Sequence, residues 1–138
     1  LVAANQLGAS PWRKIRPYRL AADYRAAGRW IAQNTPPAAR VACTEIGYLG
    51  FYSRRPIRDI HGLIHPEAMA PIRREEADWW FTTDPPELIV VHDPPWRGEP
   101  SPEWWPPASL QAFAAGYAEI HALPTLKVYG RRAPAAGS

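Results

Sequence analysis

The chain has 138 residues, a formal net charge of +3 and one cysteine. This length fits a single domain that buries a core without disulfide or metal staples. The lone Cys43 excludes an internal disulfide and lies in a strand-like run, where a small buried apolar residue is expected. No run of about twenty apolar residues is present, so the sequence predicts no segment that crosses a bilayer.

The positive charge is concentrated near the N-terminus. Six cations lie within the first thirty residues: Arg13, Lys14, Arg16, Arg19, Arg25 and Arg29. They suit either a solvated surface or a contact with anionic lipid or lipid phosphate. Nucleic acid is not expected as a partner, because no recognised nucleic-acid-reading motif accompanies the charge. The chain starts with Leu rather than Met, which suggests part of a longer protein, although a processed N-terminus or an expression scar would look alike.

The N-terminal third is predicted to hold an arm and one helix. Residues 1–16 show no hydrophobic period and are interpreted as an arm or linker. A helix is predicted over residues 17–33, because apolar side chains recur at spacings of 4, 3 and 4 residues. These are Leu20, Tyr24, Ala27 and Ile31. The prolines at 36 and 37 end this helix.

Residues 41–67 organise the rest of the prediction, with a strand at 40–44, a helical turn at 46–52 and a strand at 57–60. Glu45 and Asp59 then fall at the carboxyl ends of strands, where open parallel sheets bind ligands. Two neighbouring carboxylates could share a proton, hold a cation or bind sugar hydroxyls. Alternatively, Glu45 caps the helix and Asp59 accepts hydrogen bonds from the backbone at the Gly62 turn.

The second half is predicted to add short helices, a buried strand and a long loop. The helices are expected at 66–72 and 75–81. The strand at 87–92 has a continuous apolar run, which a strand covered on both faces requires, so it should be central. Residues 93–107 contain too many prolines for regular structure and are predicted to form a long loop.

The C-terminal region is predicted to hold a helix and a hairpin. Ser109 is expected to cap a helix at 110–116, and strands at 117–123 and 126–131 should pair antiparallel because only a turn separates them. Residues 133–138 are expected to be a disordered tail. The element order predicts an α/β three-layer sandwich with a mostly parallel sheet and an antiparallel edge hairpin, formed by one domain over residues 17–132.

Tryptophans are concentrated in or beside the proline-rich segments. Trp96, Trp104 and Trp105 could form a platform that stacks on glycan or contacts a membrane interface or partner, or they could pack structurally. In adjacent pairs such as Trp79-Trp80, one ring is expected in the core and the other on the surface.

Histidines provide weak metal or catalytic signals. His61 and His65 are four residues apart, but Gly62 and Pro66 disfavour the helix that would bring them together. A site joining these histidines to His92 and Asp93 is conceivable. We expect no metal, because that helix is disfavoured. No phosphate-binding glycine loop and no nucleophile motif is present, so nucleophilic catalysis is unsupported and no catalytic residue is assigned.

Several segments resemble the C-terminal soluble domain of bacterial multi-pass GT-C glycosyltransferases of the dolichyl-phosphate-mannose-protein mannosyltransferase-like class. They are Arg-Trp-Ile at 29–31, Asn-Thr-Pro-Pro at 34–37, Ala-Arg-Val-Ala at 39–42, Glu-Ile-Gly-Tyr-Leu-Gly-Phe-Tyr-Ser at 45–53, Arg-Pro-Ile-Arg-Asp-Ile-His-Gly-Leu at 55–63, His-Pro-Glu at 65–67 and Pro-Glu-Leu-Ile-Val-Val at 86–91. The family-like positions are Glu45, Gly47, Tyr48, Asp59, Gly62 and Leu63, with His61 standing where the family pattern differs.

This resemblance implies a parent enzyme that takes a sugar from a polyprenyl-phosphate carrier at the extracytoplasmic face of the cell membrane. The family's catalytic carboxylates belong to loops between membrane spans, so the resemblance assigns none here. The expected role is a non-catalytic domain that positions acceptor or carrier. Its partners would be the transmembrane part of the same polypeptide and a lipid-linked sugar or glycan acceptor, without a cofactor. A basic stretch at 13–19 beside a membrane span would instead favour the cytoplasmic side.

Two other functions remain open at this point. The first is a glycan-binding or protein-docking module that uses the tryptophan-rich loop. The second is a small free-standing α/β enzyme built on Asp59, His61, His92 and Asp93.

Overall fold

The computed structural model describes residues 20–133. The predicted arm at 1–16, the basic stretch at 13–19 and nearly all of the predicted tail at 133–138 lie outside this part. The elements, in chain order, are α1 (Ala21–Asn34), β1 (Val41–Cys43), α2 (Ile46–Ser53), β2 (Ile57–Asp59), the 3-10 turn η2 (Pro66–Ala68), α3 (Met69–Arg73), α4 (Trp79–Thr83), β3 (Leu88–His92), α5 (Pro107–Gly116), β4 (Tyr117–Ala122) and β5 (Leu126–Arg131).

The five strands form one mixed sheet in the order β2-β1-β3-β5-β4. β1 pairs parallel with β2 and β3, whereas β5 pairs antiparallel with β3 and β4. Four strands therefore run in one direction, and β5 runs against them. This confirms the predicted α/β class, the central place of the 88–92 strand and the antiparallel edge hairpin.

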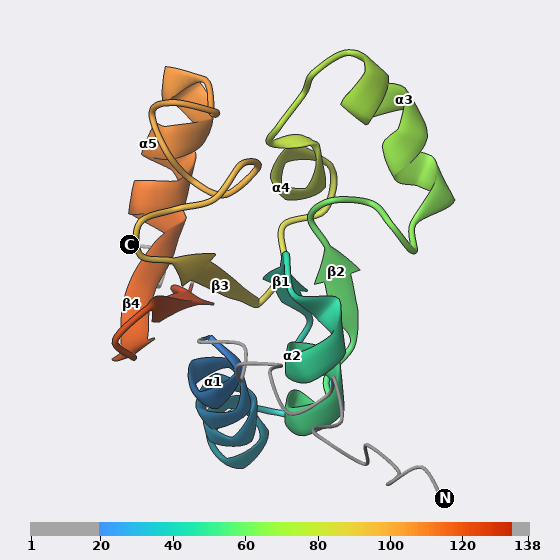
Figure 1. Ribbon diagram of the computed structural model, residues 1–138. Helices are drawn as coiled ribbons and strands as arrows, with labels where there is room; N and C mark the ends of the chain where they lie inside the picture. The colour runs from blue at the N-terminus through green and yellow to red at the C-terminus, as the bar shows by residue number, and fades with distance from the viewer. Residues whose placement is uncertain (1–19, 134–138) are drawn as a thin grey trace, which may run out of the picture.

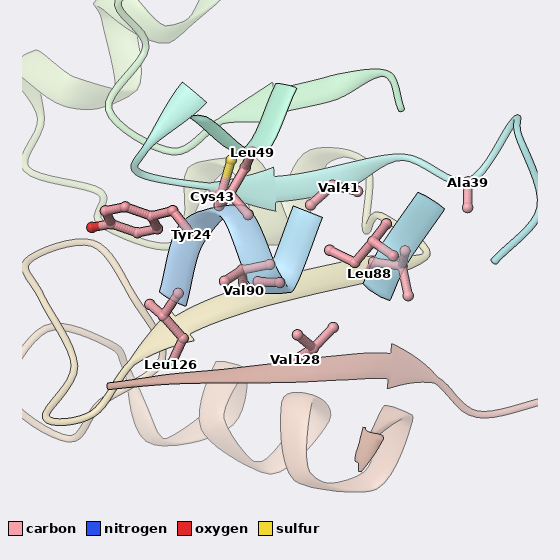
Figure 2. Close-up of a cluster of buried hydrophobic side chains, with 11 residues drawn as sticks. Tyr24, Ala39, Val41, Cys43, Leu49, Leu88, Val90, Leu126 and Val128 are labelled. Carbon is pink, nitrogen blue, oxygen red and sulfur yellow. The ribbon is translucent and has the colours of Figure 1, made fainter. Parts of the chain in front are cut away.

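Helices cover both faces of the sheet (Figure 1). α1 and α2 pack on the face that presents Val41, Cys43 and Val90, together with Leu126 and Val128 (Figure 2). The opposite face presents the alternate strand residues to α4, α5 and the indole of Trp105: Ala42, Ile89 and Val91. This alternation follows from the two-residue repeat of a strand and produces three layers. Burial also raises the pKa of the Cys43 thiol.

The predicted stripe of α1 faces the core, where Tyr24, Ala27 and Ile31 are fully buried. The helix ends one residue later than predicted, at Asn34. Its last carbonyls are satisfied by Arg55, whose guanidinium donates to the backbone oxygens of Ala32 and Thr35 at 2.8 and 2.5 Å. Such carbonyls have no partner inside the helix itself, so Arg55 joins the loop before β2 to α1.

The prediction that only one of Trp79 and Trp80 is buried is wrong. Both rings lie in the core, because each indole N–H finds a backbone acceptor there. Trp79 donates to the carbonyl of Ile60 at 3.2 Å, and Trp80 donates to that of Gly98 at 3.1 Å. The polar atom that would favour surface exposure is therefore satisfied inside the protein.

The predicted cap of α5 is also wrong. The helix begins at Pro107, a favoured first position because proline lacks the N–H that would have no partner. Ser109 lies inside the helix, and its hydroxyl donates to the carboxylate of Asp78 at 2.5 Å. This contact joins α5 to the N-terminal end of α4.

One ion pair fastens the start of β1 to the start of β3. The guanidinium of Arg40 donates from Nε and Nη2 to the two carboxylate oxygens of Glu87 at 3.0 and 2.9 Å. The backbone N–H of Arg40 also donates to Glu87 at 2.8 Å, and the N–H of Leu88 donates to the carbonyl of Arg40. The hydrogen bonds from Arg40 lower the pKa of the Glu87 carboxyl to about 2. Asp84 also pairs with Arg40.

Replacing Glu87 by Gln should destabilise the protein in a pH-dependent way. The folded-state pKa is below the unfolded-state value of about 4.3, so the pair stabilises the fold above that value. The stabilisation is lost as the pH falls toward about 2. We expect a loss of about 1 kcal/mol at neutral pH, a modest value because the side chains are partly exposed and water screens them.

Urea unfolding at neutral pH and at a pH near the folded-state pKa of Glu87, about 2, would test this expectation. Glu119→Gln is a suitable control, because Glu119 is exposed and forms no ion pair within residues 20–133. An equal loss for Glu87→Gln at both pH values would contradict the assigned role of the pair.

Candidate functional site

The carboxyl ends of β1, β2 and β3 meet at one edge of the sheet. Cys43 is in register with Asp59, and β1 also pairs parallel with β3, which ends at His92. Thr44 and Asp59 therefore lie at the same edge, as predicted. The loop between β3 and α5 folds over this edge and supplies a further acidic side chain, Glu99.

Glu45 and Asp59 bind backbone amides at this edge. Glu45 is the N-cap of α2, and its carboxylate accepts from the N–H groups of Gly47 and Tyr48 at 3.1 and 3.3 Å. Asp59 is fully buried and accepts from the N–H of His61 at 2.9 Å and of Ile64 at 3.0 Å. The structure thus shows the capping and turn contacts that the sequence offered as the alternative to a shared-proton pair.

The Asp59 contacts fix a tight loop that requires glycine at position 62. Gly62 has a φ of +70°, and an added Cβ would lie 2.3 Å from the Cβ of Ala68. Such a backbone conformation with so close a neighbour is available only to glycine. The loop then turns Leu63 outward, where its side chain is 76% exposed. Asp59, Gly62 and Leu63, which are among the residues that resemble the glycosyltransferase pattern, therefore act together to present an exposed apolar side chain.

A buried hydrogen-bond network joins the proline-rich loop to the sheet edge. Glu99 has no exposed surface. One carboxylate oxygen accepts the backbone N–H groups of His92 and Trp96, both at 2.9 Å. The other lies 2.7 Å from Nδ1 of His92 and accepts from the hydroxyl of Thr44 at 3.2 Å. Since a buried carboxylate is costly unless several donors satisfy it, this set of partners holds the loop in place.

The network continues from His92 into α1. Nε2 of His92 lies 2.5 Å from the hydroxyl of Tyr24, and the indole of Trp96 stacks flat on the imidazole with ring centroids 3.6 Å apart. A Tyr–His–Glu chain has the composition of an acid–base relay. Here all three side chains are buried, so their visible role is to connect α1, β3 and the loop.

The three tryptophans predicted as a platform occupy different environments. Trp105 is buried, and its indole N–H donates to the carbonyl of Gly98 at 3.1 Å, so it contributes no surface. Trp104 is partly exposed beneath the guanidinium of Arg97, and Trp96 is partly exposed with one face covered by His92. A stacking surface on this loop can therefore involve only Trp96 and Trp104.

The histidines and acids considered for metal binding do not come together. Imidazole Nε2 of His61 lies 3.1 Å from the backbone oxygen of Arg97, and His65 lies near Glu67. His92 faces the interior, whereas Asp93 pairs with Lys127 at 3.0 Å. Within residues 20–133, no group of three or more His, Cys, Asp or Glu side chains is arranged to hold a metal ion.

The sequence did not identify the residues of the buried network or the charged residues of a nearby cavity. Glu99 and Tyr24 were not singled out, because an acid in a proline-rich loop and a tyrosine on a core stripe carry no signal of their partners. Glu75 and Arg97 were missed as well. They line a cavity of about 280 Å³ beside His61 and Trp79, and only tertiary structure brings these segments together.

Replacing Gly62 by Ala should destabilise the protein by about 2 kcal/mol, because a side chain is strained at this positive φ and would collide with Ala68. Gly116→Ala is the matched control, since an added Cβ there has no atom within 4 Å. Its free energy of unfolding should stay equal or rise by up to about 1 kcal/mol, because Ala suits this helical position and restricts the unfolded chain. Urea unfolding followed by circular dichroism measures both, and equal effects would refute the proposed constraint.

Comparison with known proteins gives a family and no function. No helix within residues 20–133 is long and apolar enough to cross a membrane. No curated protein and no solved structure matched the chain. A family model described as "Domain of unknown function (DUF8728)" matches residues 14–135, which include every helix and strand described above. The chain therefore belongs to the DUF8728 family.

Proposed function

We propose that this chain is a non-catalytic domain of a membrane glycosyltransferase. The parent enzyme would transfer a sugar from a polyprenyl-phosphate carrier at the extracytoplasmic face of the membrane. The domain would sit against the transmembrane part of the same polypeptide and position acceptor or carrier. The resemblance of residues 45–63 to such domains supports this proposal, and the structure adds a physical reason for the motif.

The observation that carries the proposal is an exposed apolar surface on the segment after β2. Leu63 is 76% exposed, Ile64 55%, Met69 53% and Ile72 42%. We call these four residues the apolar ridge. They lie within ten residues of one another, and α3 buries none of its five residues in this domain. α3 also stands away from the sheet (Figure 1). Exposed apolar side chains concentrated in one segment of this kind favour a surface that contacts a partner or a membrane.

The way the ridge is built favours a fixed partner over random exposure. Asp59 uses a fully buried carboxylate to hold the loop, and Gly62 supplies a backbone conformation that other residues resist. A loop constrained in this manner loses little entropy on docking, which strengthens association. In a multi-pass enzyme, the transmembrane part and its connecting loops provide the apolar partner surface.

The acidic groups at the sheet edge support a role without chemistry. Glu45 caps α2, Asp59 holds a loop, and Glu99 is buried among four donors. A general acid or base must reach the proton it transfers, and these carboxylates are committed to the domain itself. The catalytic groups would accordingly belong to the membrane-embedded part.

Introducing charge on the ridge should impair the full-length parent. In Leu63→Asp combined with Ile64→Asp, two carboxylates would have to be desolvated at the docking surface. We expect sugar transfer from the polyprenyl-phosphate donor to fall at least tenfold in isolated membranes. Phe51→Asp is the control, because Phe51 is 75% exposed but lies on α2 outside the ridge. Unchanged transfer in the double variant, or the same loss in the control, would contradict the docking surface.

The 138-residue chain by itself should neither transfer nor hydrolyse the sugar of a polyprenyl-phosphate donor. Incubation of the purified chain with radiolabelled donor and acceptor, beside membranes containing the full-length parent, measures this directly. Turnover by the purified chain would overturn the non-catalytic assignment.

The coding sequence upstream of Leu1 should encode several apolar spans of about twenty residues.

A further inference from the structure

We infer that the cavity beside the apolar ridge is a binding site for a single neutral sugar ring. The inference rests on the proposed function for the natural source of that sugar, whereas the binding site itself is argued from the residues around it. The cavity has a volume of about 280 Å³ and lies between the segment after α3 and the proline-rich loop. Its polar groups come from His61, Glu75 and Arg97, and its apolar wall includes Trp79 and Ile72.

Two opposite charges line this cavity without neutralising each other. Glu75 and Arg97 are exposed, and neither forms an ion pair within the part of the chain that the structure describes. Glu76 also lines the cavity, but its carboxylate is held by Arg74 at 2.6 and 3.0 Å. The pair that remains offers one strong acceptor, Glu75, and one strong donor, Arg97.

The backbone at Glu75 gives an independent reason to assign it a role. Glu75 follows the C-cap of α3 and has a φ of +57°. This left-handed position after a helix normally holds glycine, because any side chain there is strained. The turn is closed by the N–H of Glu76, which donates to the carbonyl of Pro71 at 3.1 Å, and it places a carboxylate that forms no ion pair among the described residues at the wall of the cavity. Strained non-glycine residues concentrate at binding and catalytic sites.

The other side of the cavity is held rigidly. The guanidinium of Arg97 lies over the ring of Trp104 at 5.7 Å, and the backbone oxygen of Arg97 lies 3.1 Å from imidazole Nε2 of His61. The carbonyl of the next residue, Gly98, accepts the indole N–H groups of Trp80 and Trp105. These contacts fix the backbone that carries Arg97, which lowers the entropy cost of binding at this wall.

The chemistry of the wall selects a neutral polyol over other ligand classes. Glu75 disfavours an anion, and Arg97 disfavours a cation. A sugar hydroxyl both donates and accepts, so adjacent hydroxyls can donate to Glu75 and accept from Arg97. The C–H face of the ring can pack on the apolar side chain of Ile72, whereas the ring of Trp79 is buried and contributes only to the inner wall of the cavity. The volume lies just below the range of roughly 300 to 1,000 Å³ of most ligand pockets, which suits one sugar ring.

The position of the cavity agrees with the proposed role. Ile72 belongs both to the apolar ridge and to the cavity wall. A sugar held there would lie beside the surface that contacts the membrane-embedded part. The family-like loop at Asp59 to Leu63 also contributes His61, so the same turn would shape the docking surface and the binding site.

Titration of the isotope-labelled 138-residue chain with simple glycosides tests the inference. The probes are the methyl glycosides of mannose, glucose, galactose and N-acetylglucosamine. Binding is measured by NMR from the shifts of the backbone amide and indole N–H resonances. We expect at least one glycoside to shift the Trp79 indole and the Gly98 amide in a saturable manner. The Trp30 indole, whose ring stacks on His121 and does not line the cavity, serves as the internal reference.

Glu75→Gly separates binding from folding. This variant removes the carboxylate and relieves the backbone, so we expect affinity to fall at least tenfold while the melting temperature stays equal or rises. Arg97→Ala should weaken binding to a similar extent. Glu103→Gly is the matched control. Glu103 is an exposed acid on the proline-rich loop that also carries Arg97, but it does not line the cavity. This variant should bind the glycoside as tightly as the unsubstituted chain does.

Three results would overturn the inference: no saturable shift with any of the four glycosides, equal affinity in Glu75→Gly, or saturation by inorganic phosphate at the same resonances. None of these would change the outcome for Leu63→Asp with Ile64→Asp, since that variant tests docking through catalytic transfer. Glycoside binding together with an inactive ridge variant would support both proposals. Glycoside binding with a fully active ridge variant would support the cavity and reject the docking.

Discussion

The arrangement of this domain depends on one buried carboxylate. Glu99 comes from a loop with little regular structure, yet it has no exposed surface and accepts hydrogen bonds from two backbone amides. Its side chain also contacts His92 and Thr44, so the ends of two strands and the loop share one acceptor group. Removing a single partner from such a set would leave a buried charge unsatisfied, which costs more than an ordinary hydrogen bond contributes.

Several other features depend on the loop that Glu99 holds in place. Gly98, the preceding residue, offers the carbonyl that accepts two indole N–H groups, and this allows Trp80 and Trp105 to enter the core. Arg97 comes one residue earlier and lines the cavity. Three consecutive residues therefore serve as anchor, acceptor and cavity wall. A shift in the anchor would move the other two, which explains how an irregular segment can form part of a defined site.

Local pattern predicted the strands, but the helix expected at 75–81 is wrong, because α4 begins only at Trp79 and ends at Thr83. The apolar run at 88–91 identified the central strand, because only a doubly covered strand lacks alternation. The common edge of Thr44 and Asp59 followed from the parallel pairing of two short strands. Pattern failed where a side chain finds a distant partner. Trp79 is buried because Ile60 offers a carbonyl, and Ser109 lies within α5 because Asp78 accepts its hydroxyl. Neither partner is visible from local sequence.

The candidate site shows the same division. Glu45 and Asp59 were visible as acids at strand ends, and their contacts show that they stabilise a helix and a loop. Glu75 and Arg97 had no distinguishing pattern, since they belong to segments that meet only through the folded loop. In this domain the buried acids are satisfied by internal donors, whereas Glu75 is exposed, strained and without an ion pair among the described residues. The turn at Glu75 is closed by the N–H of Glu76, which donates to the carbonyl of Pro71 at 3.1 Å, while the Glu75 carboxylate can accept from a ligand, as the inferred sugar site requires.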